Sequence, residues 1–281
     1  MDSRAGAEPL SLSERIKPFI EAHKGQVAIA IKNLQTGETY FYHENVPMPT
    51  ASLIKFPVMI EAYRQKAERK LDFSKMLTLR EADKVPGSGV LTDHFSAGAS
   101  FSLRDGIQLM IALSDNTATN LLLDEIGLKS TAETMEAMGY PNTKLHSKVY
   151  HRETSVDPAR SKVFGLGSTT ASEMIQLFEA LHKRSLVNAE ASEAMLSHLR
   201  ACDDKDKFPR FLPEGAKIAF KTGSVDEART AAGLIECGQG AVALCVLTNK
   251  NEDRRWVVDN AGNRLCAEVA RAVYEHYRAE P

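Results

Sequence analysis

The sequence predicts an α+β or α/β protein in which both ends of the chain build one antiparallel sheet. Strand-like apolar segments lie near the two ends, between residues 26 and 43 and between residues 217 and 248. Segments of helical periodicity fill the long middle, and one more amphipathic segment lies near each end. Strands and helices therefore occur in separate runs. We expect a sheet flanked by N- and C-terminal helices, with an all-helical domain inserted into it.

The N-terminal part of the expected sheet domain begins with a helix. In residues 10–23 the apolar side chains recur at helical spacing, and Ser11 or Ser13 is placed to cap the helix. Residues 26–33 and 39–43 are strand-like and are separated by a short turn. These two segments predict the first two strands of the sheet.

The middle of the chain predicts helices separated by turns. Pro57 lies in the first turn of the first helix and lacks an N–H group, which predicts a tight or kinked start. Pro86-Gly87-Ser88-Gly89 predicts a turn. Residues 144–167 form a long irregular segment, and loops of this length in a compact domain are usually functional or disordered. The expected helices span residues 53–70, 103–113, 118–126, 169–182 and 189–202.

The C-terminal part returns to strands and closes with a helix. Residues 217–221, 228–237 and 241–248 alternate or run apolar between glycines, and residues 263–278 are helical in pattern. We therefore expect a sheet domain made of residues 1–51 and 213–281, a helical domain of residues 52–212, and an active site in the cleft between them.

The bulk composition excludes several classes of protein. A formal net charge of -2 over 281 residues gives no reason to expect nucleic acid or an anionic membrane as partner. No apolar run approaches the length of a membrane span. The cysteines form no C-x-x-C pair and no histidine cluster has ligand spacing, so we expect no metal and no cofactor. They are Cys202, Cys237, Cys245 and Cys266.

The stretch that organises the expected chemistry is Ser52-Leu53-Ile54-Lys55, at the start of the first helix of the middle. On a helix, positions i and i+3 share a face, so the Ser52 hydroxyl and the Lys55 amine would lie side by side. A serine hydroxyl needs a group that takes its proton, and a lysine does so when burial or another cation lowers its pKa. Because Ser-x-x-Lys also occurs by chance in a chain of this length, the interpretation depends on other motifs.

A second motif, Ser114-Asp115-Asn116, lies where one predicted helix ends and the next begins. Ser, Asp and Asn are also the residues that most often cap helices, so a purely structural role is the alternative. In the functional interpretation, Ser114 relays a proton to a leaving amine and Asn116 binds an amide of the substrate.

A third motif, Lys221-Thr222-Gly223-Ser224, ends one predicted strand just before another. The alternative is an edge strand that leads into a glycine turn, although Lys-Thr-Gly is rarer by chance than the other two motifs. Gly223 would let a ligand approach the backbone closely. The backbone N–H groups of Ser52 and Ser224 would then form an oxyanion site.

The three motifs, in this order and context, resemble the set found in class A serine β-lactamases and penicillin-binding proteins. Residues 86–89, 113–122 and 220–224 look like the corresponding class A segments. The resemblance covers nearly the whole chain. It implies the two-part fold, a β-lactam substrate and acyl-enzyme chemistry in the cleft between the parts.

The resemblance also implies a role for each motif residue. Ser52 would attack the lactam carbonyl, Lys55 would be its proton partner, and Ser114 would pass a proton to the departing nitrogen. Asn116 would hold the side-chain amide of the substrate. The carboxylate of the substrate would be bound by Lys221 and Thr222.

Arg229 is a further candidate for the substrate carboxylate, because it lies on the strand after the Lys-Thr-Gly motif. The alternative is an ordinary exposed strand arginine.

The long loop departs from the family pattern, because the usual E-x-x-L-N run is absent. Glu153 is the first candidate, and Asp157 the second, for the carboxylate that activates the water that frees the acyl-enzyme. In the alternative, Glu153 forms a surface pair with Arg152 or Arg160. If Glu153 has the role, Glu153→Gln should slow release of the acyl group by orders of magnitude. If no carboxylate reaches the water, the enzyme would still be acylated but release would be slow.

Three functions therefore remain open at this point. A serine β-lactamase is the leading hypothesis, and a D-Ala-D-Ala carboxypeptidase or ester hydrolase of the same fold is the second. The third is a non-catalytic penicillin-binding sensor. We expect a monomer that is periplasmic or secreted, by family resemblance, although residues 1–9 are polar and lack the apolar core of a secretory leader. The absence of that core fits a cytosolic protein, or a mature form without its leader.

Overall fold

The computed structural model describes residues 10–278. The polar segment 1–9, in which we expect no secretory leader, lies outside the described residues. Among the described helices, none combines the length and the apolar character that crossing a lipid bilayer requires.

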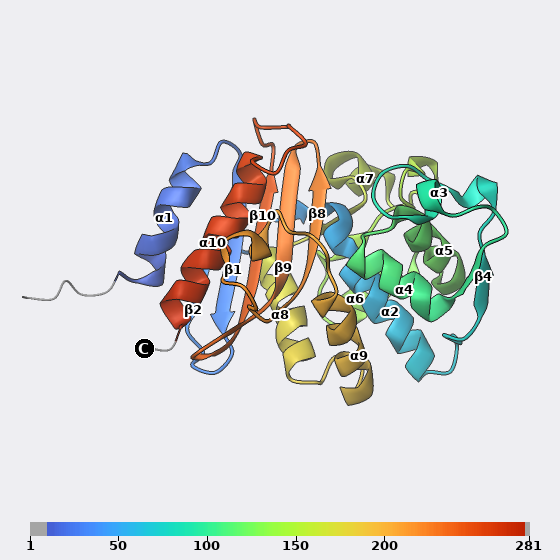
Figure 1. Ribbon diagram of the computed structural model, residues 1–281, viewed down its shortest axis with the longest axis horizontal. Coiled ribbons are helices and arrows are strands. Elements are labelled where there is room, and N and C mark those ends of the chain that lie inside the picture. The colour runs from blue at the N-terminus through green and yellow to red at the C-terminus, as the bar shows by residue number, and fades with distance from the viewer. Residues whose placement is uncertain (1–9, 279–281) are drawn as a thin grey trace, which may run out of the picture.

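A five-stranded antiparallel sheet forms one side of the molecule (Figure 1). β1 pairs with β10 in a register that runs from Gln26 opposite Asn249 to Asn33 opposite Val242, so the two ends of the chain meet inside the sheet. The order across the sheet is β2-β1-β10-β9-β8, which makes β8 an edge strand. The strands are β1 (Gln26–Asn33), β2 (Thr39–Tyr42), β8 (Ile218–Val225), β9 (Ala228–Cys237) and β10 (Gly240–Asn249).

Two helices, α1 (Leu12–Ala22) and α10 (Ala261–Tyr277), cover the outer face of the sheet (Figure 1). Ser11 caps α1: its hydroxyl accepts the Glu14 N–H, and the Glu14 carboxylate accepts the Ser11 N–H. The apolar stripes of both helices are buried against the branched side chains of the sheet. This cluster includes Leu12, Ile16, Ile29, Ile31, Val246, Val269 and Val273.

The inner face of the sheet carries small side chains and packs on α8 (Ala171–His182). Ala30, Ala232 and Ala243 belong to the same buried cluster as Phe178 of α8 and the interior of the helical part. Small residues on the sheet let the helix approach closely, and the core runs without a break from the sheet into the helices. The division into residues 1–51 with 213–281 and residues 52–212 stays a prediction.

The helical part is built around α2, which the structure surrounds with α4, α5, α6 and α9. Its helices are the 3₁₀ turn η1 (Ala51–Ile54), α2 (Lys55–Ala67), η2 (Glu81–Asp83), α3 (Leu91–His94), α4 (Leu103–Ala112), α5 (Asn116–Ile126), α6 (Ser130–Ala137), η3 (Arg152–Thr154), α7 (Pro158–Phe164), α9 (Ala189–Arg200) and η4 (Phe208–Phe211). Its short strands are β3 (Met48–Pro49), β4 (Met76–Thr78), β5 (Ser100–Ser102), β6 (Lys144–Leu145) and β7 (Gly167–Thr169).

The expected fold class is confirmed, and of the details that differ from the sequence prediction, three bear on the site or on the long loop. The helix expected over residues 53–70 is split, because the chain makes a 3₁₀ turn before Lys55 and only then becomes α-helical. β8 does not end at Lys221 but continues to Val225, so the Lys-Thr-Gly motif lies inside the edge strand. The irregular segment 144–167 contains β6, η3 and α7. Hydrogen bonds to side chains and long-range strand pairing stabilise these pieces, which local periodicity does not reveal.

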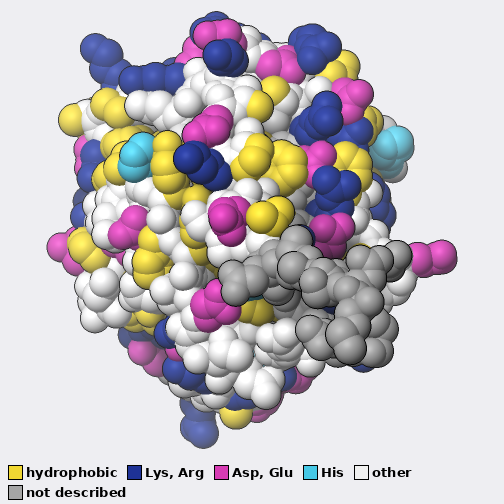
Figure 2. Space-filling model, turned by 90° about the vertical axis from the view of Figure 1, so that its left-hand side faces the viewer, with side chains coloured by type: hydrophobic (Ala, Val, Ile, Leu, Met, Phe, Trp, Pro, Cys, Tyr) yellow, Lys and Arg dark blue, Asp and Glu magenta, His cyan; other side chains and the backbone are white. Residues whose placement is uncertain are grey.

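The outer face of the sheet domain carries a mixed surface. Figure 2 shows Lys and Arg side chains interspersed with Asp and Glu over this face, apart from the part that grey atoms cover. Such a mixture creates no extended field of one sign. On this face, the described residues therefore offer no basic patch to a nucleic acid.

Asp115 joins the turn at residues 86–89 to the start of α5. Its Oδ1 accepts the Ala118 N–H at 2.8 Å as the N-cap of α5. Its Oδ2 accepts the N–H groups of Val90 at 2.7 Å and Leu91 at 2.9 Å. A Cβ on Gly89, whose φ is +115°, would lie 2.3 Å from the Asp115 carboxyl carbon. One buried carboxylate thus folds the turn against the helix.

We predict that Asp115→Ala lowers the free energy of unfolding by about 2–4 kcal/mol, because it leaves three backbone N–H groups without their acceptor. Urea titration followed by circular dichroism measures the loss. Asp157→Ala is the matched control, since Asp157 caps α7 through one N–H group and should cost only about 1 kcal/mol. Equal losses in the two variants would contradict the prediction.

Candidate active site

Ser52 lies in the 3₁₀ turn η1, directly before α2. In a 3₁₀ turn, side chains three residues apart are aligned, which puts the Ser52 and Lys55 side chains in one row. The residue before the serine, Ala51, has a left-handed φ of 45°. Pro57 lies in the first turn of α2, where the lost N–H is tolerated. The Ser52 side chain is half-buried.

Lys55 is fully buried and its amine reaches the junction between α4 and α5. Its Nζ donates to the Ser114 carbonyl at 2.6 Å, to Asn116 Oδ1 at 2.8 Å and to the Ser114 hydroxyl at 3.2 Å. Three oxygen acceptors match the three hydrogens of an ammonium group. The first two motifs are therefore in direct contact.

Ser114 connects Lys55 to the third motif. Its hydroxyl oxygen also accepts a hydrogen bond from Lys221 Nζ at 3.1 Å, and that amine donates to the Thr222 carbonyl at 3.0 Å. Ser114 has a left-handed φ of 54°, which an L-residue rarely adopts outside a tight structural constraint. One hydroxyl thus lies between two buried amines.

Gly223 brings the edge strand against the backbone of Ser52. A Cβ on Gly223 would lie 2.4 Å from the Thr50 carbonyl oxygen and 2.8 Å from the Ser52 nitrogen. Thr230, its partner on β9, donates its hydroxyl to the same Thr50 carbonyl at 2.8 Å. Any side chain at position 223 would push β8 away from η1. Ser224 follows on the strand and is half-buried.

Burial and charge lower the pKa values of both amines. Burial is the main reason that the pKa of Lys55 is well below its usual value, the nearby Lys221 lowers it further, and Asp115 opposes the shift. The pKa of Lys221 is also lowered by burial, while Cys202 and Asp204 oppose the shift. A lysine that loses its proton more easily can act as a base near neutral pH.

Asn116 and Thr222 complete the group of motif residues. The Asn116 amide donates to the Pro86 carbonyl at 2.9 Å while its oxygen accepts from Lys55. Thr222 is buried, and Asp204 lies near this strand, where its charge opposes the lowering of the pKa of Lys221 by burial. Asp204 is a residue that the sequence prediction missed, because no spacing signal connects it to the Lys-Thr-Gly motif.

Comparisons with known proteins agree with this geometry. The model of the family described as "Beta-lactamase enzyme family" matches residues 11–277. The chain belongs to this β-lactamase family. The family that the three motifs predicted is therefore confirmed.

The individual relatives are distant in sequence. The chain is 22% identical to β-lactamase BRO-1 of Moraxella catarrhalis over 85% of this chain and 75% of that one. The crystal structure of a β-lactamase from Sphaerobacter thermophilus matches with a TM-score of 0.81 and 29% identity, covering 93% and 95% of the two chains. The structure of a PBP-A mutant, titled as an acyl-enzyme complex with penicillin G, matches with a TM-score of 0.80 and 21% identity over 94% of each chain.

The two loop carboxylates are not part of this β-lactamase-family network. Glu153 is 71% exposed and its carboxylate pairs with His151 at 2.9 Å. That contact lowers the pKa of Glu153, after a larger effect of its own backbone N–H. Asp157 caps α7 by accepting the Arg160 N–H. The surface pair expected as the alternative for Glu153 exists, although its partner is His151 and neither Arg152 nor Arg160.

Arg229 lies on the face of the sheet opposite to that of Lys221 and Gly223. Its neighbour Thr230 points toward Thr50, and successive side chains of a strand point to opposite faces. The Arg229 side chain accordingly packs against Gly262 of α10. It is 1% exposed, which also contradicts the alternative of an exposed strand arginine. Its guanidinium donates to the carbonyls of Val225, Ala228 and Arg255 and lies 4.8 Å from the Trp256 ring.

The loop reaches the site with a different residue, Tyr150. A Cβ on Gly87 would lie 2.8 Å from the Asn116 amide nitrogen and 3.0 Å from the Tyr150 hydroxyl oxygen. The sequence prediction missed Tyr150, although an aromatic residue inside a long polar loop is a signal that could have found it.

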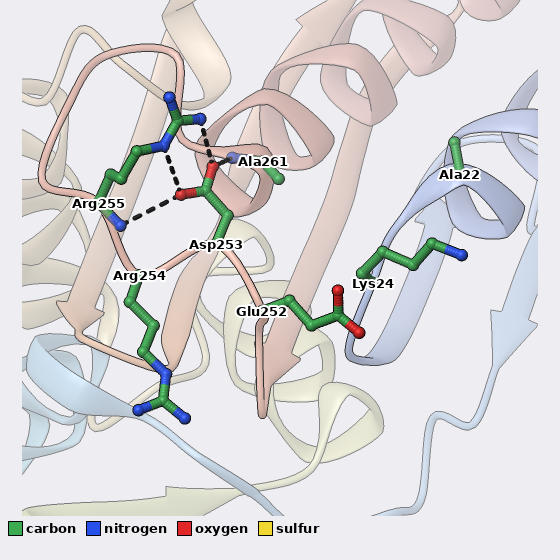
Figure 3. Close-up of a pocket in the computed structure, with 7 residues that line it drawn as sticks. All are labelled: Ala22, Lys24, Glu252, Asp253, Arg254, Arg255 and Ala261. Atoms are coloured by element: carbon green, nitrogen blue, oxygen red, sulfur yellow. Dashed lines mark hydrogen bonds and ion pairs between the residues drawn. The ribbon is translucent and has the colours of Figure 1, made fainter.

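A hollow of about 800 Å³ lies elsewhere, between the end of α1 and the start of α10 (Figure 3). Most of its lining side chains are charged, and two of them pair: the Asp253 carboxylate accepts from Arg255, and also from the Ala261 N–H. No residue of the three motifs lines it. Within residues 10–278, no group of three or more His, Cys, Asp or Glu side chains is arranged to hold a metal ion.

Proposed function

We propose that the protein is a serine β-lactamase that opens the β-lactam ring through an acyl-enzyme on Ser52. The Ser52 oxygen attacks the lactam carbonyl carbon, the ring C–N bond breaks, and water later cleaves the resulting ester. The contact of Lys55 and Lys221 with one hydroxyl, that of Ser114, is the observation that carries the proposal. Membership of the β-lactamase family supports it.

The proton path of the proposal uses the hydrogen bond between Lys55 and Ser114. Neutral Lys55 takes the proton of the Ser52 hydroxyl and becomes an ammonium group. That ammonium gives a proton to the Ser114 oxygen, 3.2 Å away, as Ser114 gives its own proton to the departing nitrogen. Lys55 is then neutral again, so charge and protons balance within the site.

Substrate binding in the proposal uses the remaining motif residues. The carboxylate of the substrate is bound by Lys221 and Thr222 on the edge strand, and its side-chain amide by Asn116. The backbone N–H groups of Ser52 and Ser224 bind the oxyanion. The close approach of Gly223 to the Ser52 nitrogen supports this, since it brings the two backbone segments together. Arg229 has no role in the proposal.

A second candidate, a D-Ala-D-Ala carboxypeptidase or ester hydrolase, is favoured by one observation. The exposed pair between Glu153 and His151 leaves this carboxylate engaged at the surface. Acylation uses the same residues in both candidates, and they differ in how fast a β-lactam product leaves Ser52.

We predict that a chromogenic cephalosporin is turned over by the wild-type protein and that Ser52→Ala abolishes turnover. Intact mass spectrometry with penicillin G should show one added acyl group on the wild type and none on Ser52→Ala. Sustained turnover selects the β-lactamase. One stoichiometric burst without turnover, combined with steady hydrolysis of a D-Ala-D-Ala peptide or ester, selects the second candidate. A wild type that is never acylated would refute both.

For Glu153→Gln we predict a rate of acyl release within about twofold of the wild type, because this exposed carboxylate contacts His151. If Glu153 were the general base, its loss would slow release by about 10²–10⁴-fold. Single-turnover mass spectrometry of the acyl-enzyme measures the release rate. The control is Glu136→Gln, a carboxylate in another exposed pair, with Lys144. A release at least a hundred times slower in Glu153→Gln alone would restore Glu153 as the base.

The pH dependence of acylation should reflect the lowered pKa of Lys55. Neutral Lys55 is required, so the acylation rate falls as the pH drops through that pKa. The pH range over which the acylation rate falls is the acidic limb of the profile. Because the charge of Lys221 is one cause of the lowered pKa of Lys55, Lys221→Met should move this limb to higher pH. Lys221→Arg keeps the charge and should leave the limb near its wild-type position. Labelling with a fluorescent penicillin across pH 4–9 measures the limb. An identical limb in the wild type and Lys221→Met would contradict the role of Lys55.

A further inference from the structure

Tyr150 occupies an unusual position in the loop between β6 and η3. It has a left-handed φ of 61°, a conformation that is an outlier for a bulky side chain. Its side chain is 63% exposed although it belongs to a loop whose neighbours Val149 and His146 are buried. A strained residue that presents an exposed ring points to function more than to packing.

Two hydrogen bonds hold the backbone beside Tyr150 to α5. The Asn120 amide donates to the Val149 carbonyl at 3.0 Å, and its oxygen accepts the Val149 N–H at 2.8 Å. Asn120 lies four residues after Asn116, so both side chains project from the same face of α5. The same helix face therefore holds the substrate-amide candidate Asn116 and the loop segment that carries Tyr150.

The loop also closes on itself next to Tyr150. The Lys148 N–H donates to the Thr154 hydroxyl at 3.0 Å, and that hydroxyl donates to the His151 carbonyl at 2.6 Å. Lys148 and His151 form an isolated antiparallel bridge around Tyr150. The tight turn fixes the direction in which the ring leaves the backbone.

The phenol ring ends beside the Asn116 amide. The hydroxyl oxygen and Cε2 of Tyr150 would lie 3.0 Å and 3.4 Å from a Cβ on Gly87, and Asn116 Nδ2 would lie 2.8 Å from the same point. Gly87, with a φ of +91°, leaves the space that the ring fills. The ring thus bridges from the loop to the turn at residues 86–89, at the edge of the site.

The distribution of strained backbone also supports a functional role for Tyr150 at the edge of the site. Two other non-glycine residues with a left-handed φ, Ala51 and Ser114, lie directly in the motif region. Tyr150 is the third such residue around the site, and it comes from a separate part of the chain. Strained conformations cluster at functional sites because only a well-determined surrounding structure maintains them.

We propose that Tyr150 is a specificity-determining residue whose ring forms the wall against which the acyl side chain of the substrate packs next to Asn116. The proposal deepens the proposed function and rests on it. A flat aromatic wall favours substrates that carry an aromatic acylamido group, because stacked or edge-to-face rings attract one another beyond simple burial of apolar area. The hydroxyl group takes no part in the chemistry.

The test compares two β-lactams that share the ring system and differ in the side chain. Penicillin G carries a benzyl group on its amide, and 6-aminopenicillanic acid carries only an amine. Tyr150→Asn removes the ring and keeps a residue that tolerates a left-handed φ, whereas Tyr150→Phe keeps the ring. Phe41→Ala is the matched control, because Phe41 is a half-exposed aromatic residue on the edge strand β2.

Tyr150→Asn should lower the second-order acylation constant for penicillin G about tenfold and leave that for 6-aminopenicillanic acid within about twofold. Tyr150→Phe and Phe41→Ala should leave both constants within about twofold. An equal loss for both substrates, or no loss, overturns the inference while the proposed function stands. A wild type that neither compound acylates would overturn the proposed function, and this inference with it. Far-UV circular dichroism and the melting temperature confirm that each variant is folded.

Discussion

One buried amine, Lys55 Nζ, holds together parts of the chain that are far apart in sequence. Lys55 begins α2, and its amine bonds to Ser114 and Asn116 at the junction of α4 and α5 and reaches β8 through the Ser114 hydroxyl. A buried ammonium group is costly unless hydrogen bonds replace its water, and here three oxygens do so. Burial also lowers the pKa of Lys55, so the amine gives up its proton more easily. The geometry of the site and the reactivity of the amine therefore have one physical origin.

The strained backbone around the amine depends on these tertiary contacts. Ala51 and Ser114 both adopt left-handed conformations that would relax in an isolated peptide. Ala51 is held because Thr50, the residue before it, accepts from Thr230 of the sheet and lies against Gly223. Ser114 is held by the Lys55 amine and by the Ser88 hydroxyl, which donates to its carbonyl at 2.8 Å. The sheet and the helical part must both be in place before Ser52 takes up its position beside Lys55.

The outline of the fold was predictable because it follows from local patterns. β1 and β9 have the bounds that the apolar runs predicted, and Ser11 caps α1 as one of the two candidates. The grouping of Lys55 with the Ser114 and Lys221 motifs was predictable because three short signals agreed in order. The orientation of Arg229 was not predictable. Side chains alternate between the two faces of a sheet, so the face on which Arg229 lies follows only once the register, with Gly223 paired to Thr230, is known. Asp204 and Tyr150 lie beside the site through tertiary contacts that leave no spacing signal in the sequence.

The structure also separates the two halves of the proposed reaction. The groups for acylation lie on η1, α2, the α4–α5 junction and β8, all of which contribute to the continuous core. Asn120 attaches the loop to that core through two hydrogen bonds with Val149, and the next residue, Tyr150, lies close to Asn116. Glu153 lies inside the segment that the hydrogen bond from Lys148 to Thr154 closes, and it faces solvent. In the proposed reaction, the groups that acylate Ser52 therefore lie in the core, whereas Glu153 lies in a loop that is closed by its own hydrogen bonds.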